Sequence, residues 1–308
     1  MGLPGDGAEK RGQSGGRGRP LVMILITGGT GFIGRHLVAR LAAEGKRVRV
    51  LARSEVELPG AELAPGDVRD LSAVVSAARE AEAVVHLVGI IREAGEASFR
   101  RVHVEGTRTV VQACREAGVK RLLHMSALGA RPQARSRYHR SKWQAEQLAA
   151  TAELATTVFR PSVVFGSGGA FLPQVRQLLH AAPVIPIVGD GMALLQPVWV
   201  EDVVSCFASA LEKQETVGQV YELGGPETFG FEQVVDLLAE VEGVRKSKVH
   251  IPAALLRPAA AVLGRLTTRF PLTSDQLTML LEDNVCDNTP MRKTFGLEPA
   301  SLRDHLAD

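Results

Sequence analysis

The sequence predicts an α/β fold in which a doubly wound parallel sheet carries helices on both faces. Three observations predict it. Apolar runs alternate with segments of helical periodicity through the first half of the chain, as strands and helices do in parallel α/β folds. A glycine-rich turn joins the first apolar run to the first helical segment. The 308 residues are enough for such a domain and a smaller second one.

The alternation continues as far as residue 164. Apolar runs predict strands at 22–26, 47–52, 83–88, 121–125 and 157–164. Helical spacing predicts helices at 32–44, 71–80, about 98–117 and 138–151. Because a strand, its crossover helix and the next parallel strand connect with a right-handed turn, these helices are expected to cover both faces of one sheet.

The glycine-rich turn, residues 27–34, has the features of a dinucleotide-binding turn. Gly28 permits a tight turn, Gly31 lets the main chain approach a pyrophosphate, and Gly34 lets the helix pack close to the strand. The free N–H groups and the positive dipole end of the helix then face the phosphates. The spacing is GxxGxxG rather than GxGxxG, so the general pattern is met loosely, but a place between strand and helix favours binding.

The overall composition excludes several function classes. The 36 basic and 34 acidic residues nearly cancel, which offers no basis for nucleic-acid binding. The three cysteines, Cys114, Cys206 and Cys286, are far apart and form no metal-binding pattern. This usage favours a reducing, cytoplasmic compartment, with neither disulfides nor a metal site.

Two segments are candidates for disorder and for membrane contact. Residues 1–20 are rich in glycine and arginine, and we expect them to be a disordered tail rather than a secretory signal. The apolar stretch 251–266 is broken by a proline and two arginines, so it is too short to span a bilayer. We expect core helices there, while a peripheral membrane contact stays open.

Tyr138 and Lys142 stand at i and i+4 near the start of a predicted helix, hence on one face. A nearby ammonium stabilises a phenolate and is expected to lower the pKa of the phenol from about 10, which suits acid–base catalysis. Ser126 follows the strand 121–125 at the carboxyl edge of the sheet, where ligands bind in open α/β folds. Each motif is weak alone. Their ordered combination predicts a catalytic set in which both hydroxyls meet one carbonyl oxygen.

With these motifs the chain resembles the short-chain dehydrogenase/reductase superfamily, in its extended or atypical branch, over residues 22 to about 300. Segments 126–130, 196–203 and 221–226 are similar to the subgroup related to the nucleotide-binding accessory subunit of respiratory complex I. Bacterial members of that subgroup are called NAD-dependent epimerase/dehydratase-like proteins. The resemblance implies a Rossmann sheet with a smaller, mainly helical C-terminal substrate domain, and Ser126, Tyr138 and Lys142 as catalytic residues.

The resemblance also implies which residues bind the coenzyme. Segment 66–68 matches the one whose aspartate approaches adenine, segment 86–89 the strand end beside the coenzyme, and segment 160–166 the strand that closes over the nicotinamide. The implied set is Gly28, Thr30, Gly31, Phe32, Ile33, Gly34, Arg35, Arg53, Asp67, Val68, Leu87, Val88, Gly89, Tyr138, Lys142, Pro161 and Val163.

One position departs from the pattern of the superfamily. Many extended members carry an asparagine on the central helix that supports a proton-relay water, where this chain has His103. His103 therefore leaves the relay open, and it is equally well interpreted as a histidine that packs the helix.

The composition of the sequence changes after Pro161. Residues 166–197 are dense in glycine and proline with one helix near 170–181, and a helix at 201–213 and a strand at 218–223 return to the sheet. We expect residues 21–165, rejoined by 198–225, to form the NAD(P)-binding domain. Residues 166–197 and 226–308 are expected to form the substrate or docking domain.

The second strand indicates which nicotinamide is bound. NAD sites usually place an acidic residue at its end to bind the ribose 2′-hydroxyl, but here Arg53 takes that place and no acid comes before Glu55. The planar fork of an arginine suits a 2′-phosphate. Arg35, directly after Gly34, could reach the same group. We therefore expect NADP(H) to be favoured over NAD(H).

The expected activity is hydride transfer between this coenzyme and a carbonyl or hydroxyl of a small-molecule substrate. Residues 166–197 are mainly apolar or small and lack an arginine cluster for a nucleotide diphosphate, which favours a quinone- or isoprenoid-like carbonyl. Two alternatives stay open. In one, the nucleotide is structural, in an accessory protein that docks on a membrane or respiratory complex. In the other, the chain is a nucleotide-sugar epimerase or dehydratase that retains its coenzyme.

Overall fold

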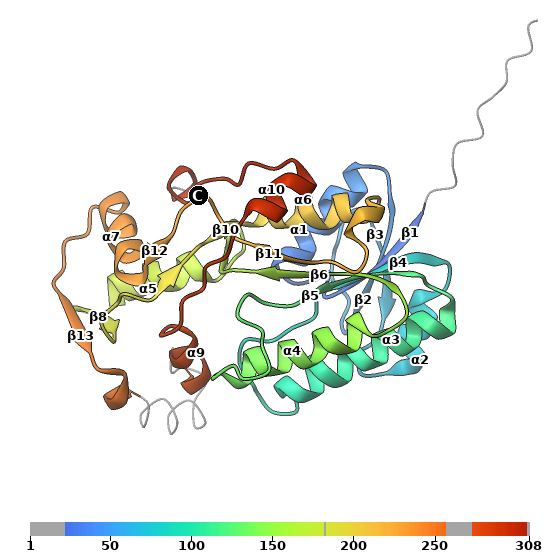
Figure 1. Ribbon diagram of the computed structural model, residues 1–308, viewed down its shortest axis with the longest axis horizontal. Coiled ribbons are helices and arrows are strands. Elements are labelled where there is room, and N and C mark those ends of the chain that lie inside the picture. The colour runs from blue at the N-terminus through green and yellow to red at the C-terminus, as the bar shows by residue number, and fades with distance from the viewer. Residues whose placement is uncertain (1–21, 182, 257–272, 307–308) are drawn as a thin grey trace, which may run out of the picture.

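A sheet of seven parallel strands, in the order β11-β6-β5-β4-β1-β2-β3, forms the centre of the protein (Figure 1). The computed structural model describes residues 22–181, 183–256 and 273–306. The strands of the sheet are β1 (Met23–Thr27), β2 (Arg47–Ala52), β3 (Ala61–Pro65), β4 (Ala81–His86), β5 (Arg121–Met125), β6 (Ala155–Pro161) and β11 (Val220–Leu223). The strand order reverses between β1 and β4, and open α/β sheets bind ligands at such a switch point. The predicted fold class is confirmed.

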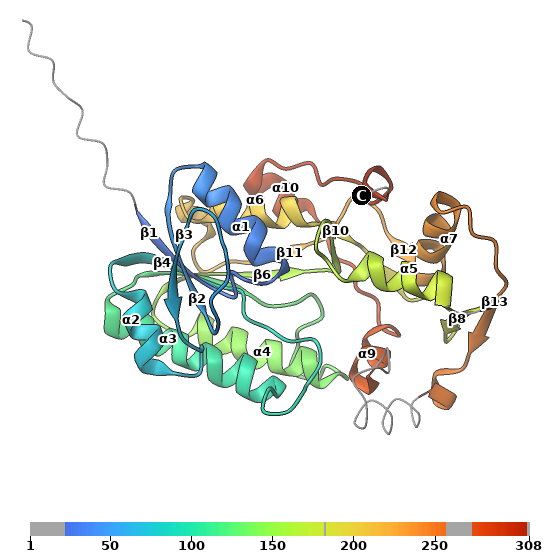
Figure 2. The same ribbon diagram turned by 180° about the vertical axis from the view of Figure 1, so that it is seen from behind.

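Helices cover both faces of the sheet (Figures 1 and 2). One face carries α1 (Phe32–Ala43), α6 (Val200–Ala210) and α10 (Thr289–Phe295), and the other carries α2 (Leu71–Ala78), α3 (Gly106–Ala117) and α4 (Arg137–Ala150). Every residue of β1 is buried, because helices pack on both of its faces. This explains why the strand has a continuous apolar sequence rather than an alternating one.

The sequence does not predict β3. It is the edge strand beside β2, and its residues Glu62 and Leu63 are exposed. An edge strand has one neighbour and buries few side chains, so it needs no apolar run. Periodicity alone therefore misses it.

A separate hydrophobic cluster lies beyond the sheet and takes residues from both pieces of the predicted second domain. Its elements include α5 (Phe171–Ala181), β8 (Ile185–Val188) and α7 (Phe231–Val241), and the strand β13 (Lys248–Ile251) lies beside β8. Leu179, Ile187 and Leu238 are fully buried in this cluster, and β8 pairs in parallel with β13. Shorter elements nearby are β7 (Val164–Phe165), β9 (Leu194–Leu195), β10 (Val198–Trp199), β12 (Phe229–Gly230) and α9 (Ser274–Met279).

Residues 226–308 contribute to both cores. Met291 and Phe295 of α10 pack in the hydrophobic core of the sheet, whereas Leu302 and Leu306 pack in the second cluster. The predicted domain boundaries themselves stay a prediction.

The predicted disordered tail, residues 1–20, and residues 257–266 of the apolar stretch lie outside the described residues. Among the residues that are described, no helix is long and apolar enough to pass through a bilayer.

Candidate active site

The turn between β1 and α1 needs glycine at two positions. Gly28 has φ +81°, and a Cβ there would come within 3.0 Å of main-chain atoms of Leu87 and Val88. A Cβ at Gly34 would lie 2.2 Å from the carbonyl oxygen of Gly28. Gly31 is exposed at the N-cap of α1, and its N–H donates to Gly28 O at 3.0 Å. The turn presents bare main chain and the free N–H groups of α1, which fits a pyrophosphate.

The other residues predicted at this turn lie around it. Thr30, Phe32 and Ile33 are half-buried, and Arg35 is exposed. The Arg35 Nε donates to the carbonyl oxygen of Thr30 at 3.0 Å, so this guanidinium is held at the mouth of the turn.

The end of β4 runs beside the turn. Leu87 N–H extends the β1–β4 ladder by one residue, Val88 is half-buried and Gly89 is exposed. A Cβ at Gly89 would lie 3.6 Å from both His103 Nε2 and Lys142 Nζ. The main chain at Gly89 therefore passes directly beside the predicted catalytic lysine.

Helix α4 holds the predicted Tyr138–Lys142 pair against the end of β5. The Ser136 hydroxyl caps the helix by accepting the N–H of His139 at 3.1 Å. Lys142 is buried, and its ammonium donates to the carbonyl oxygen of Met125 at 2.6 Å. The lysine is thus anchored one residue before Ser126.

Ser126 is also buried, and its hydroxyl has no hydrogen-bond partner among the described residues. Leaving a buried hydroxyl unpaired costs about 1–3 kcal/mol, so such a group is suited to bonding a ligand oxygen. The structure joins Ser126 and Lys142 through Met125, but no hydrogen bond links the Ser126 hydroxyl to Tyr138.

The Tyr138 ring lies in an aromatic cage, with ring centroids 5.8 Å from Phe99, 5.6 Å from His103 and 5.3 Å from His139. Burial raises the pKa of Tyr138 to about 12. The expectation that Lys142 lowers this pKa was therefore wrong, because the ammonium bonds a carbonyl oxygen while the cage removes water from the phenol. Tyr138 consequently keeps its proton at neutral pH.

The charge of Lys142 is maintained in spite of its burial. Desolvation lowers its pKa to about 8, and the carboxylate of Glu146, one turn further along α4, acts in the opposite direction. Glu146 is itself paired with Arg160 at 2.6 Å. Lys142 is therefore mostly cationic at neutral pH.

Three buried histidines, His86, His103 and His124, surround this lysine. Burial is the main cause that lowers the pKa of each, and the Lys142 charge is a further cause for all three. His86 bonds the hydroxyls of Thr27 and Thr107 at 2.6 and 3.0 Å. His124 has no partner for either ring nitrogen among the described residues. The sequence placed His86 in the segment beside the coenzyme without giving it a role, and it gave His124 no role either, although each stands near the end of an apolar strand. Within the described residues no group of side chains is arranged to hold a metal ion.

The residues predicted at the adenosine end include two with opposite charge. Arg53 is exposed directly after β2. Asp67 accepts both guanidinium bonds of Arg69, at 2.8 and 2.9 Å, and Arg69 and, more weakly, Arg53 hold the pKa of Asp67 below its usual value. Val68 is buried. Sequence reasoning missed Arg69, and its place two residues after Asp67 is the signal that could have found it.

The end of β6 carries the last two residues that the sequence predicts at the coenzyme site. Pro161 ends the strand, Val163 follows it, and both are half-buried. The Ser162 hydroxyl donates to Asn284 Oδ1 at 2.6 Å, and Asn284 Nδ2 donates to the carbonyl oxygen of Leu128 at 3.3 Å. Asn284 therefore ties the C-terminal part of the chain to the loops that follow β5 and β6. Nothing in the sequence indicated Asn284, because these partners are 122 and 156 residues away.

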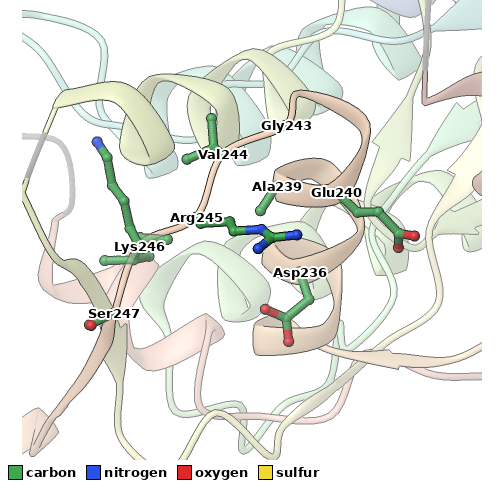
Figure 3. Close-up of a pocket in the computed structure, with 9 residues that line it drawn as sticks. Asp236, Ala239, Glu240, Gly243, Val244, Arg245, Lys246 and Ser247 are labelled. Atoms are coloured by element: carbon green, nitrogen blue, oxygen red, sulfur yellow. The ribbon is translucent and has the colours of Figure 1, made fainter.

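A hollow of about 640 Å³ lies far from this site, at the end of α7 (Figure 3). Asp236, Glu240, Arg245 and Lys246 line it, and Figure 3 shows the Arg245 side chain lying along α7 toward Asp236. It contains no predicted site residue and no unpaired buried group, so we assign it no function.

A model of the NAD dependent epimerase/dehydratase family matches residues 24–224. The chain belongs to this family. The 40 kDa subunit of mitochondrial NADH-ubiquinone oxidoreductase from Neurospora crassa is 27% identical over 290 residues, which cover 90% of this chain and 76% of that protein. Ceramide reductase from Caulobacter vibrioides is 34% identical over 173 residues, or 54% of each chain. The structure of DesIV, a dTDP-glucose 4,6-dehydratase from Streptomyces venezuelae with NAD bound, aligns with a TM-score of 0.72 at 22% identity over 93% of this chain and 95% of its own.

Membership of the epimerase/dehydratase family confirms the resemblance seen in the sequence, including its similarity to subunits of NADH-ubiquinone oxidoreductase. The protein is an NAD(P)-binding member of this family. At 22% identity the DesIV structure supports the fold alone.

Proposed function

We propose that this protein transfers a hydride between NADP(H) and a carbonyl or hydroxyl group of a small, apolar substrate. One observation carries the proposal. Lys142 binds the carbonyl oxygen of Met125, the residue before Ser126, and the buried Ser126 hydroxyl is unpaired among the described residues. The helix that carries Lys142 also carries the protonated Tyr138. A proton donor, a hydrogen-bond donor and a positive charge are what a carbonyl reduction requires.

Each of the three side chains has its own role in the proposed reaction. When bound, the nicotinamide supplies the hydride in reduction and accepts it in oxidation. Ser126 donates a hydrogen bond to the carbonyl oxygen, and Tyr138 gives that oxygen a proton. The raised pKa of Tyr138 keeps the proton in place until the oxygen becomes negative. Lys142, fixed to the Met125 carbonyl, supports the phenolate that proton transfer leaves.

The apolar nature of the substrate rests on fewer residues than the sequence indicated. Leu172, Ile185 and Ile187 are buried in the second hydrophobic cluster, so folding alone explains them. Met192 and Leu194 are 71% and 38% exposed and remain free to contact a ligand. The name of the relative ceramide reductase states a lipid substrate, which supports an apolar carbonyl compound.

The purified protein is expected to oxidise NADPH with at least one long-chain ketone, quinone or sterol ketone. Mass spectrometry of small molecules released by heating would identify the retained coenzyme and any bound substrate. A tightly retained coenzyme that is recycled in the presence of a nucleotide sugar, without net NADPH oxidation, would favour an epimerase or dehydratase instead. Lack of turnover with every carbonyl compound would contradict the proposal.

The coenzyme preference gives a separate prediction. NADPH is expected to bind at least about tenfold more tightly than NADH, a difference of about 1.4 kcal/mol, because Arg53 and Arg35 are both exposed at the adenosine end. Arg53→Asp should narrow this gap, since a carboxylate repels a 2′-phosphate and accepts the 2′-hydroxyl. Arg47→Asp, an equally exposed arginine at the start of β2, is the control. Equal dissociation constants in calorimetry would overturn the preference.

A second candidate function is docking on a membrane complex, which the 27% identity to the Neurospora crassa subunit supports. A groove of about 700 Å³ beside α4 is lined by Arg100, Arg108, Arg137 and Arg140 among others. Arg108 and Arg140 have no carboxylate partner among the described residues. Sedimentation with native membranes, compared between the natural chain and Arg108→Glu, tests this function separately from turnover.

A further inference from the structure

His103 is the buried histidine whose hydrogen bonds fix its protonation. It lies on a π-helical turn, η1 (Arg100–Glu105), that leads into α3. Its Nε2 accepts the main-chain N–H of Ile90 at 2.9 Å. Because a main-chain N–H can only donate, Nε2 carries no proton and the ring hydrogen is on Nδ1. Nδ1–H donates to the Ser141 hydroxyl at 2.8 Å.

The chain of hydrogen bonds continues to the main chain of Tyr138, the predicted proton donor. The Ser141 hydroxyl donates to the carbonyl oxygen of Tyr138 at 2.7 Å. The His103 ring also stacks on Phe99, with centroids 5.5 Å apart, and meets the Tyr138 ring edge-on. One imidazole therefore connects the main chain after β4 with the first turn of α4.

We propose that His103 is a positioning residue that clamps the main chain at Ile90 to the first turn of α4, and that its imidazole transfers no proton. This rests on the proposed function, in which Tyr138 is the proton donor beside the coenzyme. The clamp fixes the distance between the two walls of the coenzyme site, namely the strand end at Gly89–Ile90 and the helix that carries Tyr138 and Lys142.

The surroundings of His103 oppose a relay through it. Both ring nitrogens already have partners inside the protein, and adding a proton to Nε2 would break the bond to Ile90. Burial, together with the charges of Lys142 and His86, lowers the pKa of His103 to about 2, so the ring is neutral near neutral pH. A relay needs a group that gains and loses a proton in each turnover, and His103 is not such a group.

Two readouts that need no turnover test the clamp. His103→Phe keeps a ring in the cage but removes both hydrogen bonds, and should speed amide exchange at Ile90 at least about tenfold. Looser packing admits water to Tyr138, so its ionised fraction at pH 10.5 should rise at least about threefold as its pKa moves toward the usual 10. Absorbance measures this fraction, with Tyr138→Phe as the blank, because Tyr221 is the other of the two tyrosines in the chain.

Two further variants separate the links of the clamp. Ser141→Ala removes the hydroxyl that links His103 to the carbonyl oxygen of Tyr138 and leaves the bond between His103 and Ile90, so Tyr138 should ionise more readily while Ile90 exchange stays as it was. His124→Phe replaces a histidine that is equally buried but makes no hydrogen bond with the described residues, and should change neither readout. If circular dichroism shows that His103→Phe does not fold, His103→Asn is the replacement. It should give smaller increases in Ile90 amide exchange and in Tyr138 ionisation.

The pH profile of NADPH oxidation distinguishes a clamp from a relay. A clamp predicts that His103→Phe lowers kcat and keeps every ionisation in the profile, with the alkaline limb moving to lower pH as the pKa of Tyr138 falls, whereas a relay predicts the loss of one ionisation. A lost ionisation, or unchanged Ile90 exchange and Tyr138 ionisation in His103→Phe, would overturn the proposal. If the natural protein turns over no carbonyl compound, the proposed function fails, and the exchange and ionisation results still decide the clamp.

Discussion

Acidification to about pH 5 is expected to unfold this protein, because four histidines are buried in neutral form. Burial lowers the pKa of His86 to about 3, of His103 to about 2, of His139 to about 4, and of His124 well below its usual value. In the unfolded chain each binds a proton near about pH 6.5. The unfolded state therefore binds more protons below that pH, and stability falls as the pH falls.

The effect is large because the four groups act together. Each proton changes the free energy of unfolding by about 1.4 kcal/mol per pH unit, so four give a slope of about 5 kcal/mol per unit below about pH 6. A typical domain is stable by only about 5–15 kcal/mol. Urea unfolding at pH 7, 6 and 5 measures the slope directly.

Two variants identify the source of the slope. His124→Phe removes one of the four groups that bind a proton on unfolding. It should reduce the slope by about 1.4 kcal/mol per pH unit and raise the free energy of unfolding at pH 5. His250→Gln, at an exposed histidine on β13, should leave the slope unchanged. An unfolding free energy that stays constant from pH 7 to pH 5 would show that the four histidines take up protons in the folded state.

Replacing Tyr138 by phenylalanine is expected to reduce NADPH oxidation by about 10²–10⁴-fold, the usual contribution of a positioned acid or base. Phenylalanine fills the same cage of Phe99, His103 and His139, so the fold and the coenzyme affinity should be nearly unchanged. Steady-state kinetics measures the first effect and calorimetry with NADPH the second.

Tyr221→Phe is the matched control for this variant. Tyr221 is buried in the core on β11, where its ring contacts Phe159 and Phe295. Loss of its hydroxyl should leave turnover within about twofold. A Tyr138→Phe protein that retains full activity would remove the phenol from the mechanism and leave nucleotide binding as the main property of the site.

The sheet domain was predictable because its constraints are local. Strands buried on both faces have continuous apolar runs, and Gly28 and Gly34 are required by contacts within one turn. The edge strand β3 and the two-residue strands leave no such signature. Apart from β3, the strands of the central sheet follow from apolar runs in the sequence, whereas the order of elements within residues 226–308 does not.

The candidate site was predictable only in part, since its geometry depends on distant residues. Ser126, Tyr138 and Lys142 stand in recognisable motifs, but the partners of His103 and Asn284 lie 13 to 156 residues away. The pKa of Tyr138 also could not be read from spacing. Its direction depends on how far three aromatic rings exclude water, and that is a property of the packed structure.

The bonds of Asn284 to Ser162 and Leu128 have a consequence for biosynthesis. The ribosome makes the glycine turn, the serine and the tyrosine first, but the loops that enclose them acquire this brace only when residue 284 has been translated. The candidate site of a nascent chain therefore lacks this brace until residue 284 has been made. The site should therefore become complete only after residue 284 has left the ribosome, since domains form in the order in which they emerge.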